Sequence, residues 1–544
     1  MGRSPIVYRL SDPGFTIYHR AALGGLAASI RSWGIAGRGV EPPLEFEQDR
    51  RAGRGRLGDD SGRSVTTSLD EGSVTLEWEE PTTGREALAL ILTASFRRTN
   101  KGMIYLPGQG FGPEREDVHV AAHNGYSQTF LQHPKKRPGQ GIEPVTIRDD
   151  EGQAHSFSYK KVDRYSHQTA QGTSLLGEGW NIGPGDLPDT ASVSQSLLPG
   201  ATGGAGDLAG TPEQVFLLHF LMVACPVFAI RSRKREAKTQ NCLVVPDVSN
   251  LIDFASRIED IGARPIGQTN SYLGRIAGGA EEAAMRFMID LRGSESVEEL
   301  GVSGAKVYAM GKVPWDSNQQ NRSWIARIDL PSRYPDFAVF EAAEGTLGRP
   351  KIIKTKKGEP FAVPASPLPD LIAANLASGG HWSDGFRELV AKKKDFVDLS
   401  YRREGLKAMR AAIQDEIDQL IISLFQEAWD IKRHALSERV ERAYREHHVL
   451  LDYWSLVDGE RERIRNGILR CKSSDLLTHW LLAFAADARR KEPIGILSRE
   501  GVTVRKFLFN PRNVDRVQNL LLFALVSSPS TDPTGRATRP TQEG

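Results

Sequence analysis

VFLLHFLMVACPVFAI (residues 215–230), RSRKREAK (231–238) and TQNCLVVPDVSNLIDF (239–254) follow one another near the middle of the chain and decide its fold. The first segment is apolar on every side of a helix but too short to cross a bilayer, so it predicts a buried core helix that Pro226 kinks. The β-branched run Leu243–Val245, closed by Pro246, predicts a strand covered on both faces.

The run between these two segments is densely basic. Isolated charges are costly to bury, so we expect residues 231–238 to form a surface loop held between the core helix and the core strand. Two interpretations stay open, a solvated connection and a phosphate-binding edge. The second makes four residues candidate nucleic-acid contacts: Arg231, Arg233, Lys234 and Arg235.

Length and composition indicate a globular protein of several domains. With 544 residues, of which 39% are hydrophobic and 25% charged, the chain is long enough for about two to four domains. Its net charge of +2 indicates no partner by itself, because clustering matters more than the sum. The three cysteines form no CxxC pair, which argues against a disulfide framework or a zinc ribbon. Since the N-terminus also lacks the apolar core of a signal peptide, we expect a cytoplasmic protein that is not bound to a membrane.

Periodicity predicts several elements before the central stretch. A helix is expected over Ile17–Trp33 despite Gly24 and Gly25, which weaken a helix by about 1 kcal/mol each unless another backbone packs closely there. Residues 34–63, rich in Gly, Arg and Asp, are expected to form a loop. Further strands, helices and hairpins are expected at these ranges: 6–10, 64–69 with 73–78, 86–96, 103–106, 281–291, 305–313 with 323–330, and 351–355 with 360–363.

Two motifs invite a catalytic or phosphate-binding interpretation. The segment LPGQGFGP, residues 106–113, lacks the lysine of a Walker motif, so it predicts a plain turn. His119 and His123 lie one helical turn apart, a spacing that can ligate zinc, although no third ligand is marked. The pair therefore supports an alternative function, a metal-dependent nuclease or hydrolase that uses His119 and His123.

Other clusters combine cations with polar or aromatic side chains, the pattern of a nucleic-acid surface. A predicted loop over residues 124–137 pairs side chains able to bond base edges with cations for phosphates, and an aromatic, basic strand follows at 155–161. The basic tip of the 351–363 hairpin and the run at 392–394 add further cations. The candidate contacts are Asn124, Ser127, Gln128, Lys135, Lys136, Arg137, Lys160, Lys161, Lys356, Lys357, Lys392, Lys393 and Lys394.

The character of the chain changes after the proline-rich segment 364–369. Strand patterns stop, and residues 406–456 contain no Gly or Pro. We therefore predict an α+β fold, with a mixed α/β N-terminal body that contains antiparallel hairpins, followed by an all-α C-terminal bundle of four or five helices. The predicted divisions are a body over 1–365, a helical bundle over 370–528 and a disordered tail over 529–544.

Two segments resemble a known family. IVYRLSDPGFTIYHR, residues 6–20, and LVVPDVSNL, residues 243–251, look like the large subunit of Cascade, the type I CRISPR surveillance complex. The branch they most resemble is the Myxan-type group, usually placed with subtype I-B. The likeness is in these segments and the overall layout, and no catalytic signature accompanies it.

The resemblance implies a non-enzymatic subunit with no cofactor. Such subunits contact the 5′ region of crRNA, recognise the protospacer-adjacent motif on target double-stranded DNA and support R-loop formation in antiviral defence. The implied partners are crRNA, target DNA, other Cascade backbone subunits, and a helicase-nuclease recruited in trans or a transposition protein. In many members a C-terminal helical bundle stands in for the small subunit. Some related branches make that subunit from an internal start, for which Met409 is the obvious candidate here.

Overall fold

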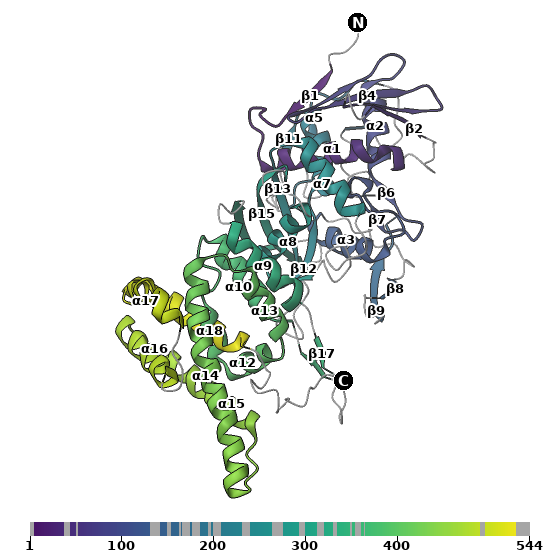
Figure 1. The fold of residues 1–544 in the computed structure, drawn as a ribbon. Coiled ribbons are helices and arrows are strands. Elements are labelled where there is room, and N and C mark those ends of the chain that lie inside the picture. The colour runs from purple at the N-terminus through teal and green to yellow at the C-terminus, as the bar shows by residue number, and fades with distance from the viewer. Residues whose placement is uncertain are drawn as a thin grey trace. The chain divides into compact units, whose positions relative to one another are not determined.

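The computed structural model divides the chain into two compact units, residues 1–330 and 331–544 (Figure 1). It describes residues 5–36, 44–49, 53–130, 142–148, 154–162, 165, 175–176, 185–193, 197–199, 208–230, 240–263, 276–292, 300–312, 320–329, 334–348, 351–353, 361–363, 365–489 and 495–528. The first unit combines mainly antiparallel sheets with helices, and the described part of residues 365–528 is helical, which confirms the predicted α+β class. The tail predicted over 529–544 lies outside the described residues.

The first unit begins with a five-stranded antiparallel sheet. Its strands lie in the order β1 (Ile6–Arg9), β5 (Ser73–Glu77), β4 (Ser64–Leu69), β3 (Arg54–Asp59) and β2 (Leu44–Asp49). The predicted hairpin of β4 and β5 is confirmed. The loop predicted over 34–63 is wrong where β2 and β3 lie, because Leu57 is fully buried and Phe46 packs edge-on against Trp33.

A second five-stranded sheet forms the centre of the first unit. Its order is β14 (Ile276–Ala277), β12 (Val227–Ile230), β13 (Gln240–Val248), β15 (Val302–Lys312) and β16 (Gln320–Asp329). Helices α1 (Ile17–Ala36), α3 (Glu116–Thr129) and α8 (Ala280–Arg292) all pack against β13. Residues 241–246 are buried without interruption, so the prediction of a strand covered on both faces is confirmed.

The predicted core helix over 215–230 needs correction. Helices α5 (Pro212–His219) and α6 (Leu221–Ala224) end before Pro226, and Val227–Ile230 is strand β12, which pairs antiparallel with β13. Proline has no N–H for a helix and disfavours helical geometry in the residue before it, so Cys225 and Pro226 separate helix from strand. The segment is buried as predicted, but only its first half is helical.

Helix α1 shows why two adjacent glycines lie inside a core helix. A Cβ added to Gly25 would lie 2.1 Å from the carbonyl oxygen of Phe220, and one added to Gly24 would lie 2.8 Å from Cγ2 of Val248. The glycines therefore allow α1 to approach the end of α5 and strand β13 more closely than any side chain would permit. The close backbone packing that the sequence required for this helix is confirmed.

The rest of the first unit surrounds these two sheets. Its elements are α2 (Gly84–Ser95), β6 (Arg97–Arg98), β7 (Ile104–Tyr105), the 3-10 helix η1 (Pro107–Gln109), β8 (Ile142–Arg148), β9 (Ala154–Lys160), β10 (Ala191–Val193), β11 (Leu208–Gly210) and α7 (Leu251–Ala263).

The second unit begins earlier than the predicted boundary at 365–370. Helix α9 (Tyr334–Leu347) and the hairpin of β17 (Lys351–Ile353) and β18 (Phe361–Val363) belong to it. Helix α9 packs on α13 (Arg403–Ala412), where Gly405 leaves no room for a Cβ beside Leu347. The proline-rich segment therefore lies inside the unit, although strands do stop there as predicted.

Residues 365–528 contain more helices than the four or five predicted. The others are α10 (Leu368–Ala377), α11 (Phe386–Ala391), α12 (Lys393–Ser400), α14 (Glu416–His447), α15 (Tyr453–Arg470), α16 (Ser474–Arg489), α17 (Gly495–Leu508) and α18 (Val514–Ser527), with the 3-10 turn η7 (Pro511–Asn513) before α18. Helix α18 is buried from Val517 to Ser527 and contacts most of the others, so it forms the centre of the bundle.

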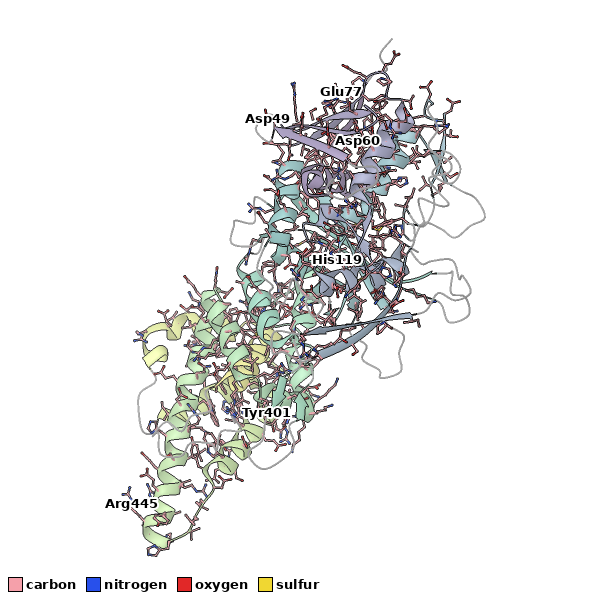
Figure 2. The ribbon with its side chains drawn as sticks, turned by 90° about the vertical axis from the view of Figure 1, so that its right-hand side faces the viewer. Asp49, Asp60, Glu77, His119, Tyr401 and Arg445 are labelled. Carbon is pink, nitrogen blue, oxygen red and sulfur yellow. The ribbon has the colours of Figure 1, made fainter. Side chains whose placement is uncertain are left out.

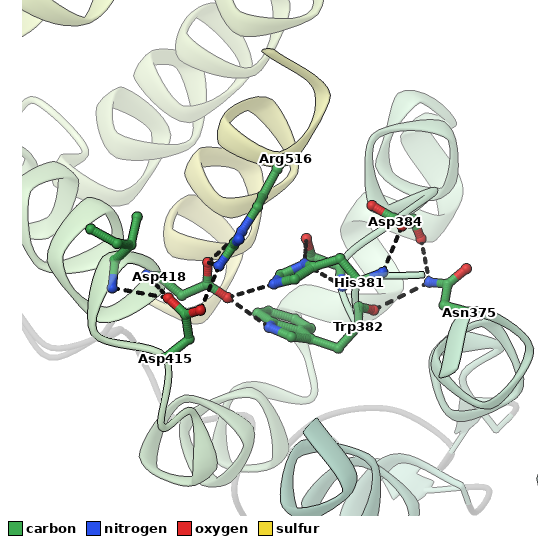
Figure 3. A network of polar contacts seen from close by, with 9 residues as sticks. Asn375, His381, Trp382, Asp384, Asp415, Asp418 and Arg516 are labelled. Atoms are coloured by element: carbon green, nitrogen blue, oxygen red, sulfur yellow. Dashed lines mark hydrogen bonds and ion pairs between the residues drawn. The ribbon is translucent and has the colours of Figure 1, made fainter. Parts of the chain in front are cut away.

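A polar network fixes the start of α14 within this bundle (Figure 3). The buried carboxylate of Asp418 accepts hydrogen bonds from Trp382 Nε1 at 2.8 Å and from the Arg516 guanidinium at 2.6 and 2.9 Å. His381 Nε2 lies 2.9 Å from the same carboxylate. A buried carboxylate is tolerated only when it is paired in this way, so the network ties the segment before α11 to α14 and α18.

No helix in the described part of the chain is long and apolar enough to cross a membrane.

Candidate nucleic-acid interface

Helix α3 and the hairpin β8–β9 carry the described part of the first candidate cluster. In Figure 1 the hairpin extends away from α3. Strands β8 and β9 pair antiparallel from Ile142 opposite Lys160 to Arg148 opposite Ala154. One face packs on the body through a small core of Met103, Val120, Val145 and Tyr159. The hairpin is therefore an ordered projection with one anchored face.

His123 anchors this hairpin to the body. Its Nε2 lies 2.7 Å from the carbonyl oxygen of Lys160 and donates to it, while Nδ1 accepts from the backbone N–H of Ile104 at 3.1 Å. The two bonds require the neutral ring with its proton on Nε2. Burial of the ring lowers the pKa of His123 to about 4, although the bond to the Lys160 carbonyl opposes the shift. His123 therefore joins three segments while neutral.

Two further contacts fix the base of the hairpin. Tyr159 donates its hydroxyl to the carbonyl oxygen of Lys101 at 3.0 Å, and Asn124 donates from Nδ2 to the carbonyl oxygen of Ser158 at 3.2 Å. Helix α3 supplies both Asn124 and His123, one residue apart. Together with the His123 bond, strand β9 is thus attached to α3 at the carbonyl oxygens of Ser158 and Lys160, which sets the orientation of its opposite face.

The opposite face of the hairpin is exposed and carries mainly small side chains. Strict alternation along both strands places eight residues on it: Ile142, Pro144, Thr146, Arg148, Ala154, Ser156, Ser158 and Lys160. Three hydroxyls thus lie between two cations on a two-stranded ribbon. A ribbon of this width fits the major groove of B-DNA, where hydroxyls can bond base edges and cations can contact phosphates.

The neighbouring lysines are held in exposed ion pairs. Lys161 Nζ lies 3.1 Å from Glu143 Oε1, and Lys101 Nζ lies 2.5 Å from Glu116 Oε1. Exposed pairs of this kind contribute at most about 1 kcal/mol, so a phosphate can replace the carboxylate. Lys160 is exposed at the hairpin base, next to this pair.

Asn124, Ser127 and Gln128 lie on α3 rather than in a loop. The predicted loop over 124–137 is wrong for residues 124–129, because the helix continues to Thr129. Ser127 Oγ donates to the His123 carbonyl oxygen at 2.8 Å, and Gln128 Oε1 accepts from Asn241 Nδ2 of strand β13 at 2.6 Å. All three side chains therefore have partners inside the first unit.

His119 has a structural contact of its own and is not part of a metal cluster among the described residues. It lies on α3 (Figure 2), and its Nε2 donates to the carbonyl oxygen of Gly112 at 2.8 Å. Burial lowers the pKa of His119. Since His123 uses both ring nitrogens, no lone pair remains there for a metal, and the described residues contain no group of three or more possible metal ligands. This geometry does not support the hydrolase alternative.

The glycines of residues 106–113 serve packing, as expected for a turn. A Cβ on Gly108 would lie 2.7 Å from Cγ1 of Val223, and one on Gly110, which has a φ of +79°, would lie 2.5 Å from the carbonyl oxygen of Ile258. Turn η1 is thus pressed between α6 and α7. A phosphate cradle needs backbone N–H groups open to a ligand, whereas those of Gln109 and Gly110 donate to the carbonyl oxygens of Leu106 and Pro107 within the turn.

The other candidate cations are distributed over both units. Lys392, Lys393 and Lys394 are exposed around the start of α12, where Lys393 Nζ lies 3.2 Å from Glu462 Oε1. The remaining candidates lie outside the described residues: Lys135, Lys136, Arg137, Arg231, Arg233, Lys234, Arg235, Lys356 and Lys357. Strands β12 and β13, which precede and follow residues 231–239, are neighbours in the central sheet.

The row of hydroxyl side chains formed by Thr146, Ser156 and Ser158 was not predicted from the sequence. The signal was the alternation over 154–160, which indicates a half-buried strand whose outward residues are the serines. Strand β8 was missed because Pro144 lies within it, a residue that argues against a strand except at an edge.

A family model and a protein of Myxococcus xanthus are similar to this chain in sequence. Residues 7–219 match the family model described as the DevT N-terminal domain. Over 504 residues the chain is 25% identical to the CRISPR-associated protein Cas8a1/Csx13 of Myxococcus xanthus (strain DK1622), and the match covers 87% of this chain and 80% of that protein. The similarity is therefore to a CRISPR-associated protein, and it extends over most of both chains.

Proposed function

We propose that the chain is the non-catalytic large subunit of a type I CRISPR RNA-guided surveillance complex. In this role it binds the 5′ region of crRNA and target double-stranded DNA, recognises the protospacer-adjacent motif and supports R-loop formation. The similarity to Cas8a1/Csx13 over 87% of the chain carries the proposal, because it spans both units. The proposed branch is the Myxan-type group, close to subtype I-B.

The exposed face of β8–β9 is the part of the described structure best suited to contact duplex DNA. Thr146, Ser156 and Ser158 supply donors and acceptors for base edges, while Arg148 and Lys160 supply phosphate contacts. Anchoring by His123 and Asn124 holds the ribbon in a defined orientation before binding, so little ordering cost remains for the complex. The hairpin thus combines base contacts with backbone contacts on one rigid support.

The clusters outside the described residues have assigned roles in the same proposal. Lys135, Lys136 and Arg137, and the basic run with Arg231, Arg233, Lys234 and Arg235, would contact phosphates of crRNA or target DNA. The helical bundle over 370–528 would act in place of a small subunit, with Lys392–Lys394 beside the displaced strand. The other backbone subunits and a helicase-nuclease acting in trans, or a transposition protein, are the partners this role requires.

A motif library tests the proposal. The complex assembled with crRNA is mixed with duplexes that share one target and carry randomised flanking bases, and bound duplexes are sequenced. We expect Ser156→Ala combined with Ser158→Ala to relax the preferred motif, since each base contact contributes about 1–3 kcal/mol of discrimination. Lys160→Ala should weaken all duplexes alike and reduce the salt slope by about one.

Matched variants on the first sheet serve as controls. Thr66→Ala removes an exposed hydroxyl from β4, and Arg54→Ala removes an exposed cation from β3, both away from the hairpin. Unchanged motif preference in the double serine variant would exclude the hairpin as the reader. Absence of any preferred motif in the wild-type complex would contradict the proposed function itself.

A further inference from the structure

The outer edge of the first sheet offers an open strand. Strand β1 is the terminal strand of the order β1-β5-β4-β3-β2. Leu10 N–H donates to the Gly72 carbonyl oxygen across the ladder, which makes this a hydrogen-bonded pair. Pairs alternate along an antiparallel ladder, so Val7, opposite Thr75, directs both its N–H and its C=O away from β5.

The rest of this edge is already closed by the chain itself. The N–H of Arg9 donates to Asp12 Oδ2 at 2.8 Å, and the carbonyl oxygen of Arg9 accepts from Asp12 N–H at 3.0 Å. Pro5 has no N–H, so only its carbonyl group is available. Among the residues that the structure describes, no strand pairs with the outer side of β1. The open part of the edge is therefore a short segment centred on Val7.

A groove of about 680 Å³ runs beside this segment. One side is β1 itself, and the other is formed by the turn after β1 and by the start of α5, which lies near β1 in Figure 1. Tyr8 fixes that side, because its hydroxyl donates to the carbonyl oxygen of Glu213 at 2.9 Å. The volume is within the range of sites that bind small ligands or a few peptide residues.

The chemistry of the groove favours a basic, extended peptide. Phe15, Pro13 and Leu187 provide apolar surface. Among the described residues that line the groove, the charged ones are Asp12 and Glu213, and both are acidic. A nucleic acid would be repelled by two carboxylates and would gain nothing from an open strand edge. An extended peptide can pair with Val7, place apolar side chains against Phe15 and Leu187, and offer cations to the carboxylates.

We propose that this groove, the β1 edge groove, binds an extended basic segment of a partner protein by strand addition to β1. The bound segment pairs its backbone with Val7 and alternates apolar with basic side chains. This surface is distinct from the β8–β9 face, and it contacts protein rather than nucleic acid. Its occupant is a partner polypeptide, and a second copy of the chain or residues 1–4 are the alternatives that the test distinguishes.

A displayed library of random octapeptides tests the proposal, because it samples the sequences that such a groove accepts. The full-length chain is the target, and the affinity of each enriched peptide is then measured with synthetic peptide. We expect enriched peptides that alternate basic and apolar residues. Methylation of the peptide backbone nitrogens on the paired side should abolish binding, since strand addition needs those N–H groups.

Variants of the chain separate backbone pairing from charge. Val7→Pro removes the outward N–H but keeps the ladder to β5, because proline is accepted at a strand edge; it should abolish binding. Val7→Thr keeps the N–H and should leave Kd unchanged. Asp12→Asn with Glu213→Gln should raise Kd about 3- to 10-fold at low salt. Glu45→Gln, on the opposite edge strand β2, should not change it.

Four outcomes would overturn the proposal. The library yields no binder, or the enriched peptides bind Val7→Pro with unchanged Kd. Deletion of residues 1–4 raises peptide affinity by orders of magnitude, which would make that segment the occupant. Finally, the chain dimerises in sedimentation and Val7→Pro makes it monomeric, which would make a second copy the occupant. Thermal unfolding of each variant confirms that β1 remains folded.

Discussion

Among the single residues, His123 is an ionisable side chain that holds the β8–β9 hairpin to the body through hydrogen bonds. It accepts from Ile104, donates to Lys160 and stacks edge-on against Tyr159. The same ring was a candidate metal ligand by sequence spacing alone. Both ring nitrogens form hydrogen bonds, so the chemical change that would affect this residue is protonation and not metal binding.

Acidification should loosen the hairpin. The pKa of His123 is lowered to about 4 by burial, so the unfolded state binds more protons than the folded state between about pH 6.5 and 4. Stability is fully present above pH 6.5 and falls as the pH drops through this window, by up to about 3 kcal/mol. Protonation also places a second N–H opposite the Ile104 N–H.

Amide exchange measured by mass spectrometry checks this, after correction for the intrinsic rate. Protection of β8–β9 should fall between pH 6.5 and 4.5 faster than that of β2–β3 in the first sheet. His123→Gln should be less protected at pH 7 and lose the pH dependence, while His155→Gln serves as the control on the hairpin itself. An equal loss of protection in β8–β9 and β2–β3 would show that His123 does not hold the β8–β9 hairpin in place.

Gly25→Ala should be strongly destabilising. The new Cβ would lie 2.1 Å from the carbonyl oxygen of Phe220, a backbone atom that cannot move without shifting α5 away from α1. We expect a loss of at least about 2 kcal/mol. Gly459→Ala in α15, where nothing lies within 4 Å, should stabilise by up to about 1 kcal/mol. Urea unfolding of both variants decides, and a neutral Gly25→Ala would contradict the packing.

At the scale of elements, the orientation of β8–β9 and the contacts of its exposed face are separate properties. Asn124 donates a hydrogen bond to the backbone carbonyl oxygen of Ser158, whereas the side chains of Ser156 and Ser158 lie on the exposed face. A variant of the support and a variant of the face should therefore affect DNA binding differently.

Asn124→Ala should weaken binding to all duplexes by a similar factor without changing the preferred motif, because it loosens the support. Gln128→Ala should behave likewise, since Gln128 bonds Asn241 inside the unit. The motif library described above measures both. Relaxed motif preference in these variants, with the preference intact in the Ser156/Ser158 variant, would show that Asn124 and Gln128 contact bases directly.

The basic run after β12 is expected to contribute to the binding of crRNA or target DNA. Replacing Arg233, Lys234 and Arg235 by Ala should leave the fold intact, because β12 and β13 on either side are held in the central sheet. Binding to crRNA or target should weaken and its salt dependence should flatten. Replacing Arg54 and Arg56 on β3 controls for lost charge. Wild-type affinity of the triple variant at physiological salt would leave the run without a role in binding.

Elements with a clear hydrophobic period were predictable, and those without one were not. Helix α1 and the hairpins β4–β5 and β15–β16 follow their periods. Residues 215–230 are apolar apart from His219, so no period distinguished helices α5 and α6 from strand β12. The candidate site was predictable only as clusters of charge. The role of His123 was not, since its partners are 19 and 37 residues away in sequence.

At the scale of the whole molecule, the second unit depends on contacts that cross the boundary predicted at 365–370. Helix α9 lies before that boundary and packs on α13 and α10, the bulk of which lies after it. The network around Asp418 requires His381 and Trp382, which an internal start at Met409 would remove. Met409 itself is buried within α13.

Three fragments should therefore differ in stability. Residues 331–544 should be soluble, helical and cooperative in thermal unfolding. Residues 370–544 should be less stable because α9 is missing, and residues 409–544 less stable again because the Asp418 carboxylate loses two of its partners. Circular dichroism melts rank them. A 409–544 fragment as stable as 331–544 would contradict this order and support an independent product from Met409.

Sequencing of the RNA bound to this chain tests whether it belongs to a complex guided by crRNA. An affinity-tagged chain is purified from its native cells at physiological salt, with an untagged strain as control, and the associated RNA is sequenced. We expect one class of short RNAs that share a constant 5′ flank followed by variable spacers. RNA indistinguishable from the untagged control, with the chain purified alone, would contradict it.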